Sequence, residues 1–307
     1  MLARVSGQRG FTLVEIVLAM GLALLVAGVA HRLLFHGQRL ARAQGERAAL
    51  QENVRVAALV LAGELRGLGY DEVTPAASAA LGHPAAIRSD LLAIAPGAVT
   101  YLAARGGGRV CGASPGPPAE VVLEESSWRS PRRPRSTDSL LIFVESDPST
   151  GSDDAWIHLG VLSDGAGSCP DGGAGIALAV AAPAPLSLAT LAGIGPGSPA
   201  RLSEVMQVRY YRSGGRSWLG LRSVGTGEAI QPVAGPLADS SAGVRGLTLA
   251  YRDATGAPTA DPAAVRSVEI ALIGVTDQPI HGRDLRRALV DTFALTTRVA
   301  LRNAPRP

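Results

Sequence analysis

The chain has 307 residues, enough for one large domain or two small ones, and 47% of them are hydrophobic. Its 29 basic residues, all arginine, outnumber 26 acidic ones and are scattered apart from one cluster at 129–135. No basic helix carries interleaved aromatic residues and only 4% of the chain is aromatic, which argues against nucleic acid or sugar as a partner.

The first predicted element is an apolar helix long enough to cross a membrane. Residues 11–30 contain one charged residue and no proline. Twenty helical residues span about 30 Å, which is the thickness of a bilayer core. A cleaved secretory signal ending between Ala27 and Ala30 is the alternative, although its apolar region would be shorter. Arginines flank the segment on both sides, so their number does not decide its orientation.

A single carboxylate, Glu15, interrupts this apolar segment near its start. A charge inside a bilayer costs up to about 3 kcal/mol, so such a residue is a candidate functional site unless it reaches the headgroups from the edge. Around it, Gly10 precedes an aromatic residue, and Thr-Leu-Val-Glu leads into the apolar helix. This motif resembles the processing signal of type IV prepilins and pseudopilins, and every position from Gly10 to Glu15 matches.

The resemblance implies that a prepilin peptidase cuts between Gly10 and Phe11 and that the new Phe11 amine is methylated. Residues 1–10 would then be a leader on the cytoplasmic side. It also implies that Glu15 pairs with the N-terminal amine of a neighbouring subunit, so that two charges costly in lipid neutralise each other between packed helices. Glu15 is therefore expected to be an assembly contact, and no catalytic residue is predicted.

The helical pattern continues through residues 31–70, which form an amphipathic extension of the apolar segment. No proline interrupts it before Leu68, and a glycine-punctuated stop follows at Gly67 and Gly69. An apolar stripe with one polar member, Arg47, recurs every three or four residues and comprises Leu40, Ala43, Leu50, Val54, Ala57, Leu61, Leu65 and Leu68. The pattern predicts one helix over 11–70 whose second part packs under a head. Gly21 and Gly28 share a helix face that would permit close helix approach, or are ordinary membrane-helix glycines.

The head is expected to comprise residues 71–307, with an irregular, insertion-rich part at 75–200 and an antiparallel sheet at 202–303. Short apolar runs predict strands in the irregular part at 91–95, 121–125, 139–145 and 156–162. In the second part we predict a hairpin over 204–224, turned at 213–215, and further strands at 244–253, 265–275 and 291–303. A long helix covering one face of an antiparallel sheet makes the predicted fold α+β.

Three other features are candidate sites. If the head is exported, Cys111 and Cys169 are expected to form one disulfide, with two unpaired buried thiols as the alternative. Alternating acidic and small residues at 147–154 resemble a calcium loop but lack the bidentate glutamate, so an ordinary turn is the simpler interpretation. The arginine cluster at 129–135 is interpreted as a solvated loop, with a site for an acidic partner as the alternative. No metal or cofactor is predicted.

Three segments narrow the resemblance to a subgroup. Residues 53–70, 244–253 and 296–303 are similar to PilW-type minor pilins, with J-type minor pseudopilins of type II secretion as near competitors. The resemblance implies a single-pass inner-membrane precursor with a periplasmic head, which then enters a filament and initiates or caps it. Its partners would be the peptidase and other pilins, and it would not be an enzyme. An anchored exported enzyme or binding protein is the alternative from another class.

Overall fold

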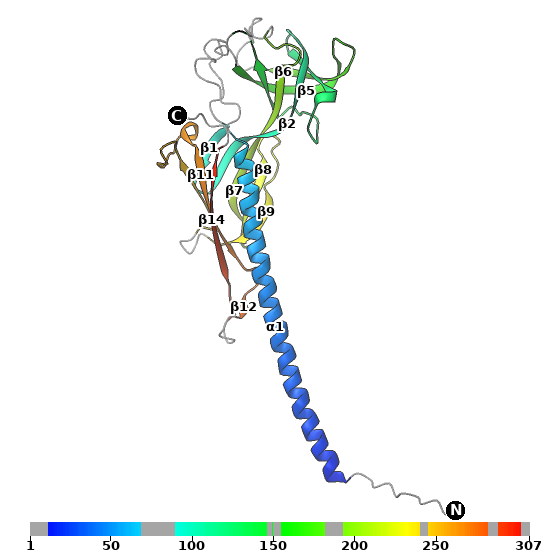
Figure 1. Cartoon of the computed structure of the whole chain (residues 1–307), viewed down its shortest axis with the longest axis vertical. Helices are drawn as coiled ribbons and strands as arrows, with labels where there is room; N and C mark the ends of the chain where they lie inside the picture. Colours follow the sequence, from blue (N-terminus) through cyan, green and yellow to red (C-terminus); the bar gives the residue numbers. More distant parts are fainter. Residues whose placement is uncertain are drawn as a thin grey trace, which may run out of the picture. The chain divides into compact units, whose positions relative to one another are not determined.

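The computed structural model describes residues 12–68, 90–145, 149, 155–181, 193–239, 245–281 and 288–301. They form one long helix and an extensive antiparallel sheet, so the predicted α+β class is confirmed (Figure 1). The chain divides into two compact units. The first comprises residues 1–49 with 276–291, and the second comprises 50–275 with 292–307.

The helix α1 runs over Leu13–Arg66, and the first strands are β1 (Leu91–Ala95), β2 (Ala98–Ser114), β3 (Ala119–Glu124), β4 (Ser139–Val144), β5 (Ala155–Ser168), β6 (Ala174–Ala181) and β7 (Pro199–Ser213). The later strands are β8 (Arg216–Ser223), β9 (Gln231–Leu237), β10 (Leu247–Arg252), β11 (Ser267–Val275), β12 (Ile280–His281), β13 (Ala288–Leu289) and β14 (Thr292–Ala300). Two short 3₁₀ helices, η1 (Glu125–Ser127) and η3 (Pro262–Ala264), lie between strands.

In the second unit, α1 packs its apolar stripe against the sheet, as the sequence predicts. The buried residues are Leu50, Val54, Ala57, Ala58, Leu61, Ala62 and Leu65 of α1, and Leu68 just after it. They share one core with apolar residues at alternate positions of the strands, among them Val99, Val208, Leu219, Leu247, Leu249, Val268, Ile270 and Leu272. We call this the helix–sheet core. The period of 3.6 on the helix and of 2 on the strands brings these two faces together.

The strands predicted after residue 202 are present. β7 and β8 form a hairpin with Ser213 paired to Arg216, and both turn glycines have positive φ, 59° at Gly214 and 76° at Gly215. These angles are typical of a type I′ turn, whose twist matches that of the flanking strands. β11 pairs along one edge with β10 and along its full length with β14.

The strands predicted at 91–95, 121–125, 139–145 and 156–162 correspond to β1, β3, β4 and β5, and the residues described between 75 and 200 form a more regular structure than expected. β2, β3, β6, β5, β4 and β7 pair in that order, and β2 pairs again with β7, so these strands close into an antiparallel barrel. Its filling, which we call the barrel core, is aliphatic and includes Val121, Leu123, Leu140, Ile142, Leu159, Ile176, Leu178 and Leu202. A narrow barrel is filled by its own inward-facing side chains, so this is a second packed core.

β2 and β7 belong to both cores. They pair from Ala98 with Arg209 at one end to Arg109 with Pro199 at the other. β7 supplies Val208 to the helix–sheet core and Leu202 to the barrel core. Figure 1 shows the two strands continuing from the sheet beside α1 into the barrel.

In the first unit, the hairpin β12–β13 lies against α1 (Figure 1). The backbone N–H of Gln278 donates to Glu46 Oε2 at 3.2 Å, and Arg47 Nε donates to Asp291 Oδ2 at 2.8 Å. Arg47, the one polar member of the predicted stripe, therefore pairs with a carboxylate. The residues just before β12 and just after β13 therefore both contact the helix, at the base of the hairpin.

Candidate functional site

The first half of α1 exposes apolar side chains all round its circumference. Leu13, Leu24 and Leu33 are 80%, 72% and 68% exposed, and the apolar residues between them are similarly accessible. The helix is long and apolar enough to cross a membrane. A helix that is apolar on every side and unburied in its own chain requires an apolar environment from outside, which is a bilayer or other helices.

Glu15 lies in the first turn of this helix, where it forms a reciprocal cap with Thr12. Its Oε2 accepts hydrogen bonds from the Thr12 backbone N–H at 3.0 Å and from the Thr12 hydroxyl at 3.1 Å. In return, the Glu15 backbone N–H donates to the Thr12 hydroxyl at 3.3 Å. This capping box satisfies donors that a helix start leaves unpaired, and the carboxylate lies at the positive end of the helix dipole. Gly10 and Phe11, the predicted processing residues, lie outside the described residues.

A groove follows the same half of α1 around Gly21. It is lined by Leu13, Val14, Val17, Leu18, Gly21, Leu22 and Leu25. A Cβ atom at Gly21 or Gly28 would meet nothing within 4 Å, so both glycines face open space in this chain. The groove is apolar throughout, and small residues at such a place allow two helix backbones to approach closely.

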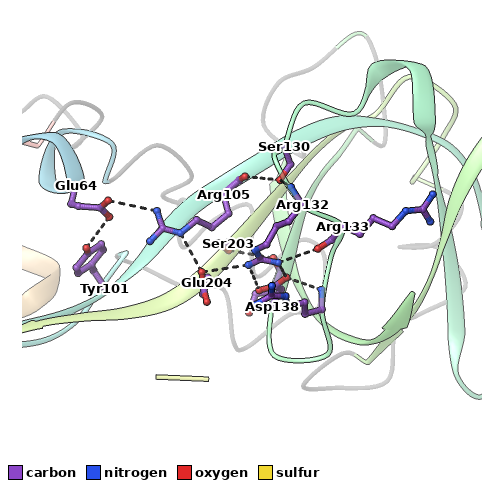
Figure 2. Close-up of polar contacts among 11 residues, drawn as sticks. Glu64, Tyr101, Arg105, Ser130, Arg132, Arg133, Asp138, Ser203 and Glu204 are labelled. Carbon is purple, nitrogen blue, oxygen red and sulfur yellow. Dashed lines mark hydrogen bonds and ion pairs between the residues drawn. The ribbon is translucent and has the colours of Figure 1, made fainter. Parts of the chain in front are cut away.

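A chain of charged side chains in the second unit was not predicted from the sequence (Figure 2). Tyr101 donates its hydroxyl hydrogen bond to Glu64 Oε2 at 2.8 Å. Arg105 lies between two carboxylates, with Nη1 3.6 Å from Glu64 Oε1 and Nε donating to Glu204 Oε2 at 3.2 Å. This series of paired side chains thus begins on α1, continues on β2 and reaches β7.

The same chain continues to the arginine cluster. Arg132 donates two hydrogen bonds to the Asp138 carboxylate, at 2.6 and 2.8 Å, and one to Glu204 Oε2 at 3.4 Å. The backbone N–H of Arg135 also donates to Asp138, at 2.8 Å. The Asp138 side chain is fully buried, and that of Arg132 is 21% exposed. We call Glu64, Tyr101, Arg105, Arg132, Asp138 and Glu204 the ionic chain.

The ionic chain stabilises its charged forms. Burial alone would raise the pKa of Glu204, but the nearby Ser223 hydroxyl, Arg105 and Arg132 outweigh it, so this pKa lies below its ordinary value. The hydrogen bond to Asp138 raises the pKa of Arg132. Burial, reinforced by Glu64, raises the pKa of Tyr101, which therefore stays protonated and acts as a donor. Each member of the ionic chain is paired with another member, so the ionic chain connects α1, β2 and β7.

The predicted disulfide is present, joining Cys111 in β2 to Cys169 after β5. The two Cα atoms are 5.5 Å apart and the residues are 58 positions apart in sequence. The Cys169 backbone N–H also donates to the Gly173 carbonyl at 2.8 Å, so the bond reaches the turn between β5 and β6. The disulfide therefore fixes one end of the barrel.

Two other sites considered from the sequence were the arginine cluster and the calcium loop. The interpretation of 129–135 as a solvated loop is wrong for Arg132, which is drawn into the ionic chain by Asp138. The possible calcium loop at 147–154 lies outside the described residues apart from Ser149. Among the described residues, no group of three histidine, cysteine, aspartate or glutamate side chains is placed to hold a metal ion.

No family model, curated protein or solved structure matches this chain.

Proposed function

We propose that the protein is a minor type IV pilin that initiates or caps a pilus. In this proposal it is a single-pass inner-membrane precursor, is cut between Gly10 and Phe11, is N-methylated at Phe11, and enters the filament through α1. Its partners are the prepilin peptidase and other pilins. A minor pseudopilin of a type II secretion system is the near alternative, since it would use the same helix in the same way.

The proposal rests on the difference between the two halves of α1. Its first half exposes apolar side chains on every side, with Glu15 in the first turn, and its second half packs under the sheet. A simple membrane tether needs the apolar length but no carboxylate at its start, whose burial in lipid is costly. A subunit that moves from lipid into a helical bundle needs both features, because the carboxylate can then pair with a neighbour's amine.

The first test compares the mass and N-terminal sequence of the membrane-extracted protein with and without a prepilin peptidase. We expect a start at methylated Phe11 that depends on the peptidase. A start at Met1, or a cut between Ala27 and Ala30, would rule out the proposal and support the tether or the secretory signal, respectively.

The same preparation then separates the two roles of Glu15. Glu15→Ala removes the carboxylate and both hydrogen bonds that it accepts, whereas Thr12→Ala removes only the hydrogen bonds of the hydroxyl and keeps the carboxylate. We expect Glu15→Ala to block recovery in sheared filaments, and Thr12→Ala to be recovered at close to the parent level. Equal loss in both variants would mean that Glu15 acts only through the helix start, and normal recovery of Glu15→Ala would favour the tether.

A further inference from the structure

The first unit contains a groove between α1 and the hairpin β12–β13. It is lined by Arg39, Arg42, Ala43, Gly45, Glu46, Gln278, Pro279 and Ile280, with a volume of about 540 Å³. Its apolar floor is formed by Ala43 and Ile280, each only 6% exposed. Its rim is polar, and Arg39 and Arg42 stand on the helix side.

The charges at this rim are unbalanced. Glu46 accepts from Gln278, and Arg47 pairs with Asp291, so both are engaged within the unit. Among the described residues, Arg39 and Arg42 make no ion pair or hydrogen bond, and both are exposed. Arg32 shares their helix face, since positions 32, 39 and 42 are seven and three residues apart. The lining thus carries two guanidinium groups against one carboxylate, that of Glu46, which leaves a net positive charge.

Distance along the helix places this rim beside the bilayer surface. Exposed apolar residues continue past Ala30 to Leu34 at 67% and Phe35 at 49% exposure. From Phe35, Arg39 is about 6 Å and Arg42 about 10 Å farther along the axis. The headgroup layer is about 5–7 Å thick on each side of the hydrocarbon core, and arginine side chains are long enough to reach it from these positions.

The hairpin adds apolar side chains at the same level. Leu289 of β13 is 57% exposed and Val290 is 52% exposed, although Ile280, paired with Leu289 across the hairpin, is buried. Arginines beside exposed aliphatic residues form the composition that binds the interface of anionic membranes.

We propose that this groove and the hairpin β12–β13 form a foot that rests on the outer leaflet of the membrane spanned by α1. Arg39 and Arg42 bind the phosphates of anionic phospholipids, and Leu289 and Val290 enter the interface. The inference rests on the membrane insertion contained in the proposed function. It adds a lipid-binding surface that holds the precursor in place before assembly.

The test uses the full chain reconstituted into phosphatidylcholine vesicles, with and without phosphatidylglycerol, in which the acyl chains carry bromine quenchers. Leu289→Trp reports on the hairpin, and Leu162→Trp, at a 48% exposed leucine of β5, is its matched control. The emission of the three native tryptophans is subtracted using the parent protein. We expect bromine to quench Leu289→Trp and not Leu162→Trp, and only when phosphatidylglycerol is present.

A second pair of variants tests the arginines. In the Leu289→Trp background, Arg39→Gln with Arg42→Gln should reduce the quenching by about twofold or more, since each basic residue near an anionic surface contributes about 1 kcal/mol. Arg55→Gln, at an exposed arginine farther along α1, should leave it unchanged.

Each other outcome overturns the proposal in a recognisable way. Equal quenching of the two tryptophan variants, or no dependence on phosphatidylglycerol, would exclude a phosphate-binding foot while leaving membrane insertion intact. Emission of Leu289→Trp that depends on protein density in neutral vesicles would show that another protein copy occupies the groove. Failure of the chain to stay in vesicles at alkaline pH would overturn both this inference and the proposed function.

Discussion

At the scale of single residues, Glu204 connects two arginines that come from different parts of the sequence. Arg105 lies on β2, and Arg132 belongs to the cluster before β4, yet both approach one carboxylate whose side chain is 10% exposed. Buried charges persist only when they are paired and hydrogen-bonded, and this carboxylate holds two such partners in place.

The pKa of Glu204 predicts the pH dependence of stability. Because this pKa is lower in the folded chain than the ordinary glutamate value of about 4.3, the contribution is complete above that value and is lost as pH falls through the folded pKa. We expect the free energy of unfolding to decline as pH falls below about 4.3. Chemical denaturation of the detergent-solubilised chain at a series of pH values measures this.

Glu204→Gln should weaken that dependence and lower the free energy of unfolding at pH 7 by about 1–3 kcal/mol, because two charged donors lose an anionic acceptor. Glu228→Gln, at an exposed glutamate, is the control and should leave the pH profile unaltered. If the free energy of unfolding depends on pH in the same way in both variants, Glu204 does not cause that dependence.

The sequence could not reveal the ionic chain. Arg132 lies among four arginines and two prolines at 129–135, a composition typical of an exposed loop. Its partners are Asp138, six residues later, and Glu204, 72 residues later. No single helix or strand spans either separation, so no periodic pattern in the sequence connects these residues. By contrast, Glu15 was identifiable because its neighbours form a local motif.

At the scale of elements, α1 and β11 come unusually close at Gly274. A Cβ atom built there would lie 2.5 Å from Val54 Cγ2 and 2.7 Å from Leu50 Cδ1. The glycine thus lets the helix lie directly on the strand, and any side chain at this position would push the two apart.

We therefore expect Gly274→Ala to lower the free energy of unfolding by about 1–3 kcal/mol through overpacking. Gly63→Ala is a matched control, because a Cβ atom there meets nothing within 4 Å and alanine favours a helix by about 1 kcal/mol. Urea unfolding should therefore shift in opposite directions for the two variants. A neutral Gly274→Ala would mean that the helix can move away from β11 at little cost.

Elements with a strong period were predictable, and those without one were not. The alternating apolar residues of β10 and β11 and the double-glycine turn after β7 are local signals, and each was recognised. β2 contains Gly106–Gly108 and β9 contains two prolines, so both lack the pattern of a strand. Their conformation is decided by neighbouring strands, because strand formation depends on the partner more than on intrinsic preference.

At the scale of the second unit, the disulfide is expected to stabilise both cores, although it lies in the barrel. Closing a loop of 58 residues stabilises a fold by about 4 kcal/mol in the chain-entropy model. Because β2 and β7 pass through both cores, loosening the barrel should also weaken the helix–sheet core.

For Cys111→Ala with Cys169→Ala we thus expect one cooperative unfolding transition at lower denaturant concentration. Hydrogen exchange should show β6 and β11 losing protection together, since β6 lines the barrel and β11 lines the other core. Loss of protection in β6 alone would show that the two cores unfold independently.

The closing of the barrel by β2 and β7 also suggests how such a head can diversify. Residues 110–198 depart from the β2–β7 pairing after Arg109 and return to it at Pro199, and these two residues are paired neighbours. The whole excursion is thus topologically an insertion into one hairpin, with both of its junctions at the same point. Residues 110–198 could be lengthened, shortened or exchanged while the register of β2 with β7 and the packing of α1 on the sheet stay the same. Such changes would leave the helix–sheet core in place, so the barrel is the part of the second unit whose size can vary most freely.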